Sequence, residues 1–254
     1  MAKTPVRQLK SHAPRRRQKE SLILSSMDEE SYRGKVKSDP DPLIAKTESQ
    51  AAFISSIKVN TVTFGIGPAG TGKTYLATTL ACNALMDGTT DRIIITRPAV
   101  EAGEELGFMP GDLSEKFAPY FAPVRQVLER RLGRGAVEMY LKNEKILILP
   151  LAHMRGWTFD DAFVVLDEAQ NTSPAQMKMF LTRIGDRTKV VVDGDLSQRD
   201  LPGPSGLADS VRRIQSLVGV GVVTFTKSDV VRSGLTQRIV ECYEEPSEEI
   251  LMAR

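Results

Sequence analysis

Short apolar runs alternate with amphipathic stretches along most of the chain from residue 47 onward. Six runs are continuous and rich in β-branched residues, which predicts strands at 61–66, 92–96, 145–149, 162–166, 189–192 and 220–225. Apolar positions at helical spacing predict helices at 73–86, 119–132, 174–184, 205–217 and 234–244. Strands without polar alternation are covered on both faces. The pattern therefore predicts one α/β domain, a three-layer α/β/α sandwich with a mostly parallel sheet.

The two ends of the chain lack this pattern. Residues 1–46 are rich in Lys, Arg, Ser, Asp and Pro, so we expect a disordered basic tail and linker there, a domain over 47–245 and a C-terminal tail over 246–254. The first 19 residues hold seven basic side chains and no acidic one. Two interpretations stay open: an arm that binds nucleic acid, or a solvated tail that aids solubility.

Composition narrows the class of protein. The 254 residues carry a formal net charge of +2, with two cysteines and two histidines. Cys82 and Cys242 cannot build a disulfide framework, which favours a reducing compartment, and neither histidine has a partner at metal-ligand spacing, which disfavours zinc. The longest apolar stretch, 146–152, contains Pro150 and is far shorter than the roughly 20 residues of a membrane helix. We therefore expect a cytoplasmic protein without a membrane segment.

The strongest motif follows the first predicted strand and opens the helix at 73–86. It matches G-x-x-x-x-G-K-[ST] and consists of Gly67, Pro68, Ala69, Gly70, Thr71, Gly72, Lys73 and Thr74. The glycines let successive backbone N–H groups turn inward and hold a phosphate at the positive end of a helix. Lys73 would contact the β- and γ-phosphate oxygens, and the Thr74 hydroxyl would be a ligand of Mg²⁺. The motif predicts a P-loop fold that binds ATP and Mg²⁺.

Two further polar clusters follow predicted strands. Asp167 and Glu168 end the strand at 162–166, where open parallel sheets bind ligands. Asp167 would hold Mg²⁺, and Glu168 would take a proton from the attacking water; alternatively, the pair caps the helix at 174. Gln198 follows the strand at 189–192 and would sense the γ-phosphate or position the water, unless it is only a surface residue after an Asp-Gly turn.

The order of these three motifs resembles the first recombinase-like domain of superfamily 1 helicases. The segments at 96–104, 106–111, 154–156 and 194–202 are more specific and resemble the PhoH-like family of ATPases over residues 47–243. That resemblance implies ATP binding and hydrolysis, RNA association and ring-shaped homo-oligomers such as hexamers. It also implies that Gln50 lies where related ATPases read the adenine. Trp157 stands where the family usually has a second arginine, and we interpret it as a half-buried loop anchor, with stacking on a base as the alternative.

A catalytic arginine is expected, because such a residue stabilises transition-state charge in phosphoryl transfer. The single sheet leaves no room for a second recombinase-like domain to supply it, so a neighbouring subunit is the expected donor. The candidates are Arg232, Arg183 and Arg97, of which we favour Arg232; each of them could instead form a surface ion pair.

RNA contact is the weaker prediction. Thr96 and Arg97 end a strand that we place beside the phosphate-loop strand, and aromatic and basic residues follow it: Phe108, Lys116, Phe117, Tyr120 and Phe121. Aromatic rings with cations stack bases and neutralise phosphates. Several of these rings, with Val124 and Leu128, also fall at helical spacing, which is equally typical of a core.

The leading hypothesis is an Mg²⁺-dependent ATPase that acts as an oligomeric ring on RNA. The alternative is a nucleotide-binding regulatory or interaction protein that hydrolyses slowly and has no motor activity. A small-molecule phosphotransferase fits the phosphate loop but not the water-activating acid pair. The sequence makes no prediction about helicase activity, because a motor needs relative motion between domains or subunits.

Salt dependence tests the basic tail. If residues 1–19 contact phosphates, their deletion should flatten the dependence of RNA affinity on salt concentration, because fewer counterions are released on binding. An unchanged slope would leave only the solubility interpretation.

Overall fold

The computed structural model describes residues 42–98, 118–231, 234 and 239. Most of the two predicted tails and of the predicted helix at 234–244 lies outside these residues, as does Arg232.

Six strands form one sheet in which every pairing is parallel, as the apolar runs predict. The strands are β1 (Val62–Ile66), β2 (Arg92–Arg97), β3 (Ile146–Pro150), β4 (Ala162–Leu166), β5 (Lys189–Gly194) and β6 (Val220–Thr224). Their order across the sheet is β3-β2-β4-β5-β1-β6. All five residues of β4 are buried, which explains its unbroken apolar sequence. The fold class predicted from the sequence is confirmed.

The position of β2 was predicted wrongly. It pairs with β3 and β4, so β4 and β5 lie between it and β1. In register, Leu166 of β4 is opposite Thr96 of β2 on one side and Val192 of β5 on the other. Local apolar patterns show that a strand is buried but not which strands are its neighbours. Because β2 is beside β4, Arg97 at the end of β2 lies next to Asp167 and not next to the phosphate loop.

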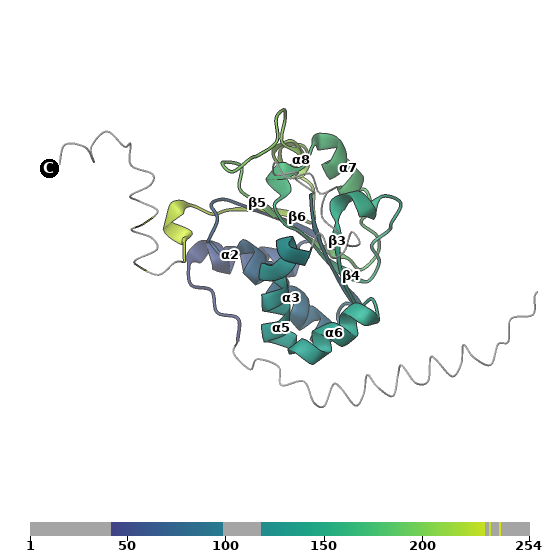
Figure 1. Ribbon diagram of the computed structural model, residues 1–254. Helices are drawn as coiled ribbons and strands as arrows, with labels where there is room; N and C mark the ends of the chain where they lie inside the picture. The colour runs from purple at the N-terminus through teal and green to yellow at the C-terminus, as the bar shows by residue number, and fades with distance from the viewer. Residues whose placement is uncertain (1–41, 99–117, 232–233, 235–238, 240–254) are drawn as a thin grey trace, which may run out of the picture. The chain divides into compact units, whose positions relative to one another are not determined.

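Helices cover both faces of the sheet (Figure 1). One face carries α2 (Glu48–Val59), α3 (Lys73–Met86), α5 (Ala122–Leu132) and α6 (Arg134–Lys142), and the other carries α7 (Pro174–Leu181) and α8 (Gly206–Ile214). The 3₁₀ turns are η2 (Ala118–Phe121), η3 (Leu151–Met154), η4 (Ala169–Asn171) and η5 (Lys227–Asp229). Apolar side chains of alternate strand residues, such as Ile94 and Val164, pack with Met177, Phe180 and Leu207 of the α7–α8 layer. The three-layer sandwich is therefore present.

Several helices differ from their predicted form. The sequence patterns did not predict α2 or α6, and α7 and α8 end earlier than expected. Ser173 caps α7 through a capping box with Gln176, so the acid pair before it is not the cap of that helix.

Aromatic residues of the predicted RNA segment divide between core and surface. Phe121, Val124 and Leu128 are buried, whereas Tyr120 is 41% exposed. Phe108, Lys116 and Phe117 lie outside the described residues. Trp157 is partly buried against the core, in keeping with the loop-anchor interpretation.

Two aromatic residues, Phe53 of α2 and Phe225 after β6, pack against each other next to β1. Phe53 of α2 is fully buried and packs edge-on against Phe225, with ring centroids 5.4 Å apart. Its ring fills the space beside Gly65, where a Cβ atom would lie 2.7 Å from it. The backbone N–H of Phe225 donates to the carbonyl of Ile66, at the end of β1. The strand that leads into the phosphate loop is thus held from two sides.

Asp229 joins the segment after β6 to the start of α2. Its carboxylate accepts from the backbone N–H of Thr226 at 2.9 Å and from the Thr226 hydroxyl at 3.1 Å. Burial alone would raise the pKa of Asp229. Hydrogen bonds from Thr226, and from the Thr47 and Ser49 side chains, outweigh burial and lower that pKa below its ordinary value.

Substitution Asp229→Asn should therefore destabilise the protein in a pH-dependent way. The folded-state pKa lies below the unfolded one, so the carboxylate stabilises the fold above its ordinary pKa of about 3.9, and this contribution disappears as the pH falls through the folded-state value. We expect the variant to lose on the order of 1 kcal/mol of unfolding free energy at pH 7 and to approach the wild type in acid. Denaturant titrations across pH measure this, with Asp91→Asn, at an exposed residue just before β2, as the control. A pH-independent difference would contradict the prediction.

Candidate nucleotide and metal site

The phosphate loop has the backbone that its glycines predict. It begins after β1, and Gly67, Gly70 and Gly72 have φ angles of 147°, 81° and 86°. Such positive φ values are inexpensive only for glycine. Gly72 is the left-handed cap before Lys73, where α3 begins. The loop thus ends at a helix N-terminus, which favours anionic phosphate groups.

The segment after β6 packs against the phosphate loop and forms a hydrogen bond with it. A Cβ atom on Gly67 would lie 2.3 Å from the carbonyl oxygen of Phe225, so only glycine fits there. The backbone N–H of Val231 donates to the Gly70 carbonyl at 3.0 Å. Arg232 follows Val231 directly in the chain but lies outside the described residues.

Lys73 and Gln50 both contact the loop. The Lys73 ammonium is buried and donates to the carbonyl oxygens of Gly67 at 2.7 Å and Pro68 at 2.8 Å. The Gln50 amide donates to the Thr71 carbonyl at 2.9 Å and accepts from the Lys46 backbone at 2.8 Å. Gln50 therefore joins the loop to the segment before α2, and its contact with adenine stays a prediction.

The two predicted metal ligands touch. The Thr74 hydroxyl donates to Asp167 Oδ1 at 3.0 Å, although 93 residues separate them. Both face a cavity of about 220 Å³, whose walls also include Lys73, Glu168 and Gln198. Among the described residues, no group of three His, Cys, Asp or Glu could hold a metal. One hydroxyl and one carboxylate nevertheless fit Mg²⁺, which is usually bound by one or two carboxylates, waters and substrate phosphates.

Asp193 is a site residue that the sequence did not single out. It is the second-to-last residue of β5, is 1% exposed and lines the same cavity as Asp167. Burial first, and then the charge of Asp167, raise the pKa of Asp193 well above its ordinary value. Burial would also raise the pKa of Asp167, but a hydrogen bond from Asp193, together with Arg97 and Thr74, lowers it. Burial beside Asp167 therefore disfavours the charged form of Asp193, whereas Arg97 and the hydrogen bonds favour the charged form of Asp167.

Gln170 links the acid pair to the third motif. Its buried amide donates to Glu168 Oε2 at 2.6 Å and to the Gln198 carbonyl at 3.3 Å, and it accepts from the Asp195 backbone at 3.0 Å. The Glu168 side chain is 46% exposed, and its backbone is left-handed with φ of 56°. Gln198 is exposed and lines the same cavity as Glu168, so the structure brings the two residues to one site.

The arginine candidates lie in different places. Arg97 contacts Asp167 within its own chain, at 2.6 Å. Arg183 donates to the Met179 carbonyl, and its own carbonyl accepts from Phe159, which precedes β4. Arg183 is thus near the opposite edge of the sheet from the phosphate loop.

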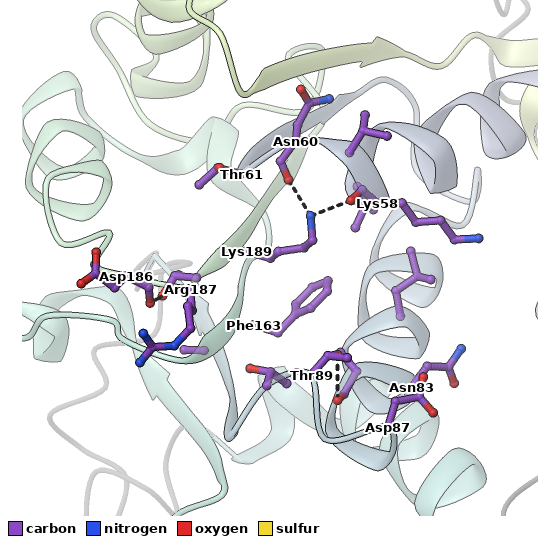
Figure 2. Close-up of a pocket in the computed structure, with 18 residues that line it drawn as sticks. Lys58, Asn60, Thr61, Asn83, Asp87, Thr89, Phe163, Asp186, Arg187 and Lys189 are labelled. Atoms are coloured by element: carbon purple, nitrogen blue, oxygen red, sulfur yellow. Dashed lines mark hydrogen bonds between the residues drawn. The ribbon is translucent and has the colours of Figure 1, made fainter.

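A second, larger cavity of about 880 Å³ lies at the amino ends of the strands (Figure 2). Lys189 points into it and donates to the carbonyl oxygens of Lys58 at 2.8 Å and Asn60 at 2.9 Å. Arg187 on its rim is paired with Asp161. These cations already have partners, and no phosphate loop faces this cavity, so it is not the triphosphate site. Within the described part of the chain, no helix is long and apolar enough to cross a membrane.

A parallel sheet with G-x-x-x-x-G-K-T between its first strand and helix, and an acidic residue at the end of a nearby strand, defines the P-loop NTPase class of fold. Residues 42–244 match the family described as PhoH-like protein. The chain belongs to this family.

Three curated relatives show how close the match is. The chain is 51% identical over 201 residues to the PhoH-like protein of Bacillus subtilis (strain 168), covering 78% of this chain and 63% of that protein. It is 48% identical over 209 residues to Protein PhoH of Escherichia coli (strain K12), covering 81% and 59%. The PhoH-like protein of Synechocystis sp. (strain ATCC 27184 / PCC 6803 / Kazusa) is 49% identical over 202 residues, covering 79% and 62%. The chain thus spans about three fifths of the length of these relatives.

A solved structure of the large terminase from a thermophilic bacteriophage aligns with 82% of this chain and 52% of its own, at a TM-score of 0.49 and 11% identity.

The loop geometry leads to a prediction about two glycines. Gly67→Ala would meet the Phe225 backbone, whereas Gly88→Ala, also at positive φ, has nothing within 4 Å. We expect Gly88→Ala to cost about 1–2 kcal/mol of unfolding free energy from backbone strain alone. Gly67→Ala should cost clearly more and abolish binding of a fluorescent ATP analogue. Denaturant titration and fluorescence measure the two effects, and equal losses in both variants would contradict the steric argument.

Proposed function

We propose that this protein is an Mg²⁺-dependent ATPase whose site lies at the carboxyl ends of β1, β5 and β4. The contact between Thr74 and Asp167 carries the proposal, because it joins the phosphate loop to the acidic strand end within one cavity. Family membership supports nucleotide binding by this fold. The loop N–H groups and Lys73 would hold the β- and γ-phosphates. Thr74 and Asp167 would hold Mg²⁺, which when bound neutralises charge that develops on the phosphate oxygens.

Glu168 is the proposed general base. Its carboxylate is accessible, yet its Oε2 atom accepts a hydrogen bond from Gln170, which fixes its direction. A carboxylate held in this way can accept a proton from water that attacks the γ-phosphate. Gln198 lies on the same cavity wall and is proposed to orient that water. Arg232 of a neighbouring subunit is proposed to stabilise the transition-state charge.

Glu168→Gln should separate binding from chemistry. The amide keeps the shape of the side chain but cannot accept the proton, so we expect ATP to stay bound while turnover falls at least about 100-fold. Steady-state phosphate release and equilibrium ATP binding measure the two properties. Glu138→Gln is the control, because Glu138 is exposed on α6 and paired with Arg134. Unchanged turnover in Glu168→Gln would remove the catalytic assignment.

RNA association and ring assembly extend the proposal. Tyr120 is exposed, and its backbone carbonyl accepts from Arg97, which places this residue near the carboxyl end of β2. An exposed aromatic ring there could stack on a base of a single-stranded polynucleotide. A catalytic arginine from a second subunit requires an oligomer. A cytoplasmic setting is proposed because the two cysteines cannot build a disulfide framework, and Cys82 is a buried free thiol.

The alternative is a nucleotide-binding regulatory protein that hydrolyses slowly. The two functions differ in their response to RNA and in assembly. For the ATPase, we expect single-stranded RNA to stimulate phosphate release and ATP to increase the mass of the particle in solution. Slow turnover that RNA does not alter, from a particle whose mass ATP does not change, would favour the regulatory function.

A further inference from the structure

Arg97 lies at the acidic strand end because of the sheet order. It is the last residue of β2, and the neighbouring strand β4 ends one residue before Asp167. The backbone N–H of Asp167 donates to the Thr96 carbonyl at 3.0 Å, which keeps the two strand ends together. The Arg97 side chain is 20% exposed, whereas that of Asp167 is 3% exposed. A cation is thus aimed at a buried carboxylate.

The two oxygens of Asp167 have different partners. Oδ1 accepts from the Thr74 hydroxyl and from the backbone N–H of Glu168, each at 3.0 Å. Oδ2 accepts from Arg97 Nε at 2.8 Å and from Arg97 Nη2 at 2.6 Å. A planar guanidinium that grips one oxygen with two nitrogens resists rotation of the carboxylate. Arg97 therefore keeps Oδ1 turned toward Thr74, the side where both proposed metal ligands meet.

The guanidinium is itself fixed at a third point. Arg97 Nη1 donates to the Tyr120 carbonyl at 2.6 Å, and Nη2 lies 3.8 Å from Glu168 Oε1. The Tyr120 contact is to the backbone, so it depends on the position of η2 and not on the tyrosine ring. With all three nitrogens engaged, Arg97 behaves as a rigid spacer between η2 and Asp167.

We infer that Arg97 is a positioning residue for Asp167. By orienting this carboxylate, Arg97 determines how much Mg²⁺ increases the affinity for nucleotide. The inference rests on the proposed function, because it concerns the same metal site. Arg97 acts through Asp167 and touches neither the metal nor the nucleotide. Groups that orient a metal ligand commonly contribute about 10- to 100-fold to metal affinity.

The test compares nucleotide affinity with and without the metal. The dissociation constant of a fluorescent ATP analogue is measured for the full chain in excess EDTA and in excess Mg²⁺, and the ratio reports the contribution of Mg²⁺. For Arg97→Gln we expect this ratio to fall about tenfold or more, while the constant in EDTA changes less than about twofold. Arg97→Lys keeps the charge but not the two-nitrogen grip, so it should restore only part of the ratio.

Arg125→Gln is the matched control. Arg125 lies on α5, is 45% exposed and pairs with Glu129 one helical turn away. This exposed ion pair differs from that of Arg97, whose partner Asp167 is buried. Its substitution should change neither dissociation constant. Melting temperatures of all variants are measured alongside, so that a loss of fold is recognised.

Three results would overturn the inference. An unchanged Mg²⁺ ratio in Arg97→Gln, with both dissociation constants unchanged, would show that Asp167 needs no positioning by Arg97, and an accompanying loss of turnover would assign Arg97 to the substrate instead. Equal losses of affinity in EDTA and in Mg²⁺ would reduce Arg97 to a structural ion pair. Full rescue by Arg97→Lys would show that charge alone, without orientation, is what matters. If the wild type binds no nucleotide under either condition, the proposed function fails as well, which distinguishes that failure from the other three.

Discussion

Negative charge buried at the ends of two neighbouring strands is the constraint around which the site is built. Asp167 and Asp193 are both almost fully buried, and Glu168 is adjacent to them. Two ionised carboxylates cannot share such a place without a large free-energy penalty. Burial and the charge of Asp167 raise the pKa of Asp193 and so disfavour a second charge there, while the charge of Lys73 acts on Asp193 and Arg97 pairs with Asp167.

The strand order produces this concentration of charge. β5 lies between β1 and β4, so Asp193 is placed between the phosphate loop and Asp167. Because adjacent strands lie about 4.8 Å apart, the first turn of α3 has to reach across the end of β5 to meet the acidic strand. Thr74 makes that contact, and the carboxyl ends of parallel strands supply the common edge.

The sequence was sufficient to predict all six strands and α3, because unbroken apolar runs and a glycine loop are local signals. Helix α2 was missed because it buries only three residues, one of which is the polar Gln50. The place of β2 was predicted wrongly because strand order is set by contacts between segments far apart in the chain. The same limit hid the role of two site residues. Asp193 belonged only to a predicted Asp-Gly turn. Arg97 was predicted as a catalytic arginine, a surface ion-pair residue or part of an RNA-contact segment, because its partner is 70 residues away.

The motifs also depend on one another more closely than their separation in sequence suggests. Gln170 contacts both Glu168 and the segment containing Gln198, and Asn171 pairs with Asp200 through two hydrogen bonds of 2.8 and 2.9 Å. The residues after β4 therefore fix the loop that follows β5. Groups joined in one hydrogen-bonded network respond together when one member is changed. The acid pair and the Gln198 segment thus form a single unit, positioned by the turn η4 that lies between them.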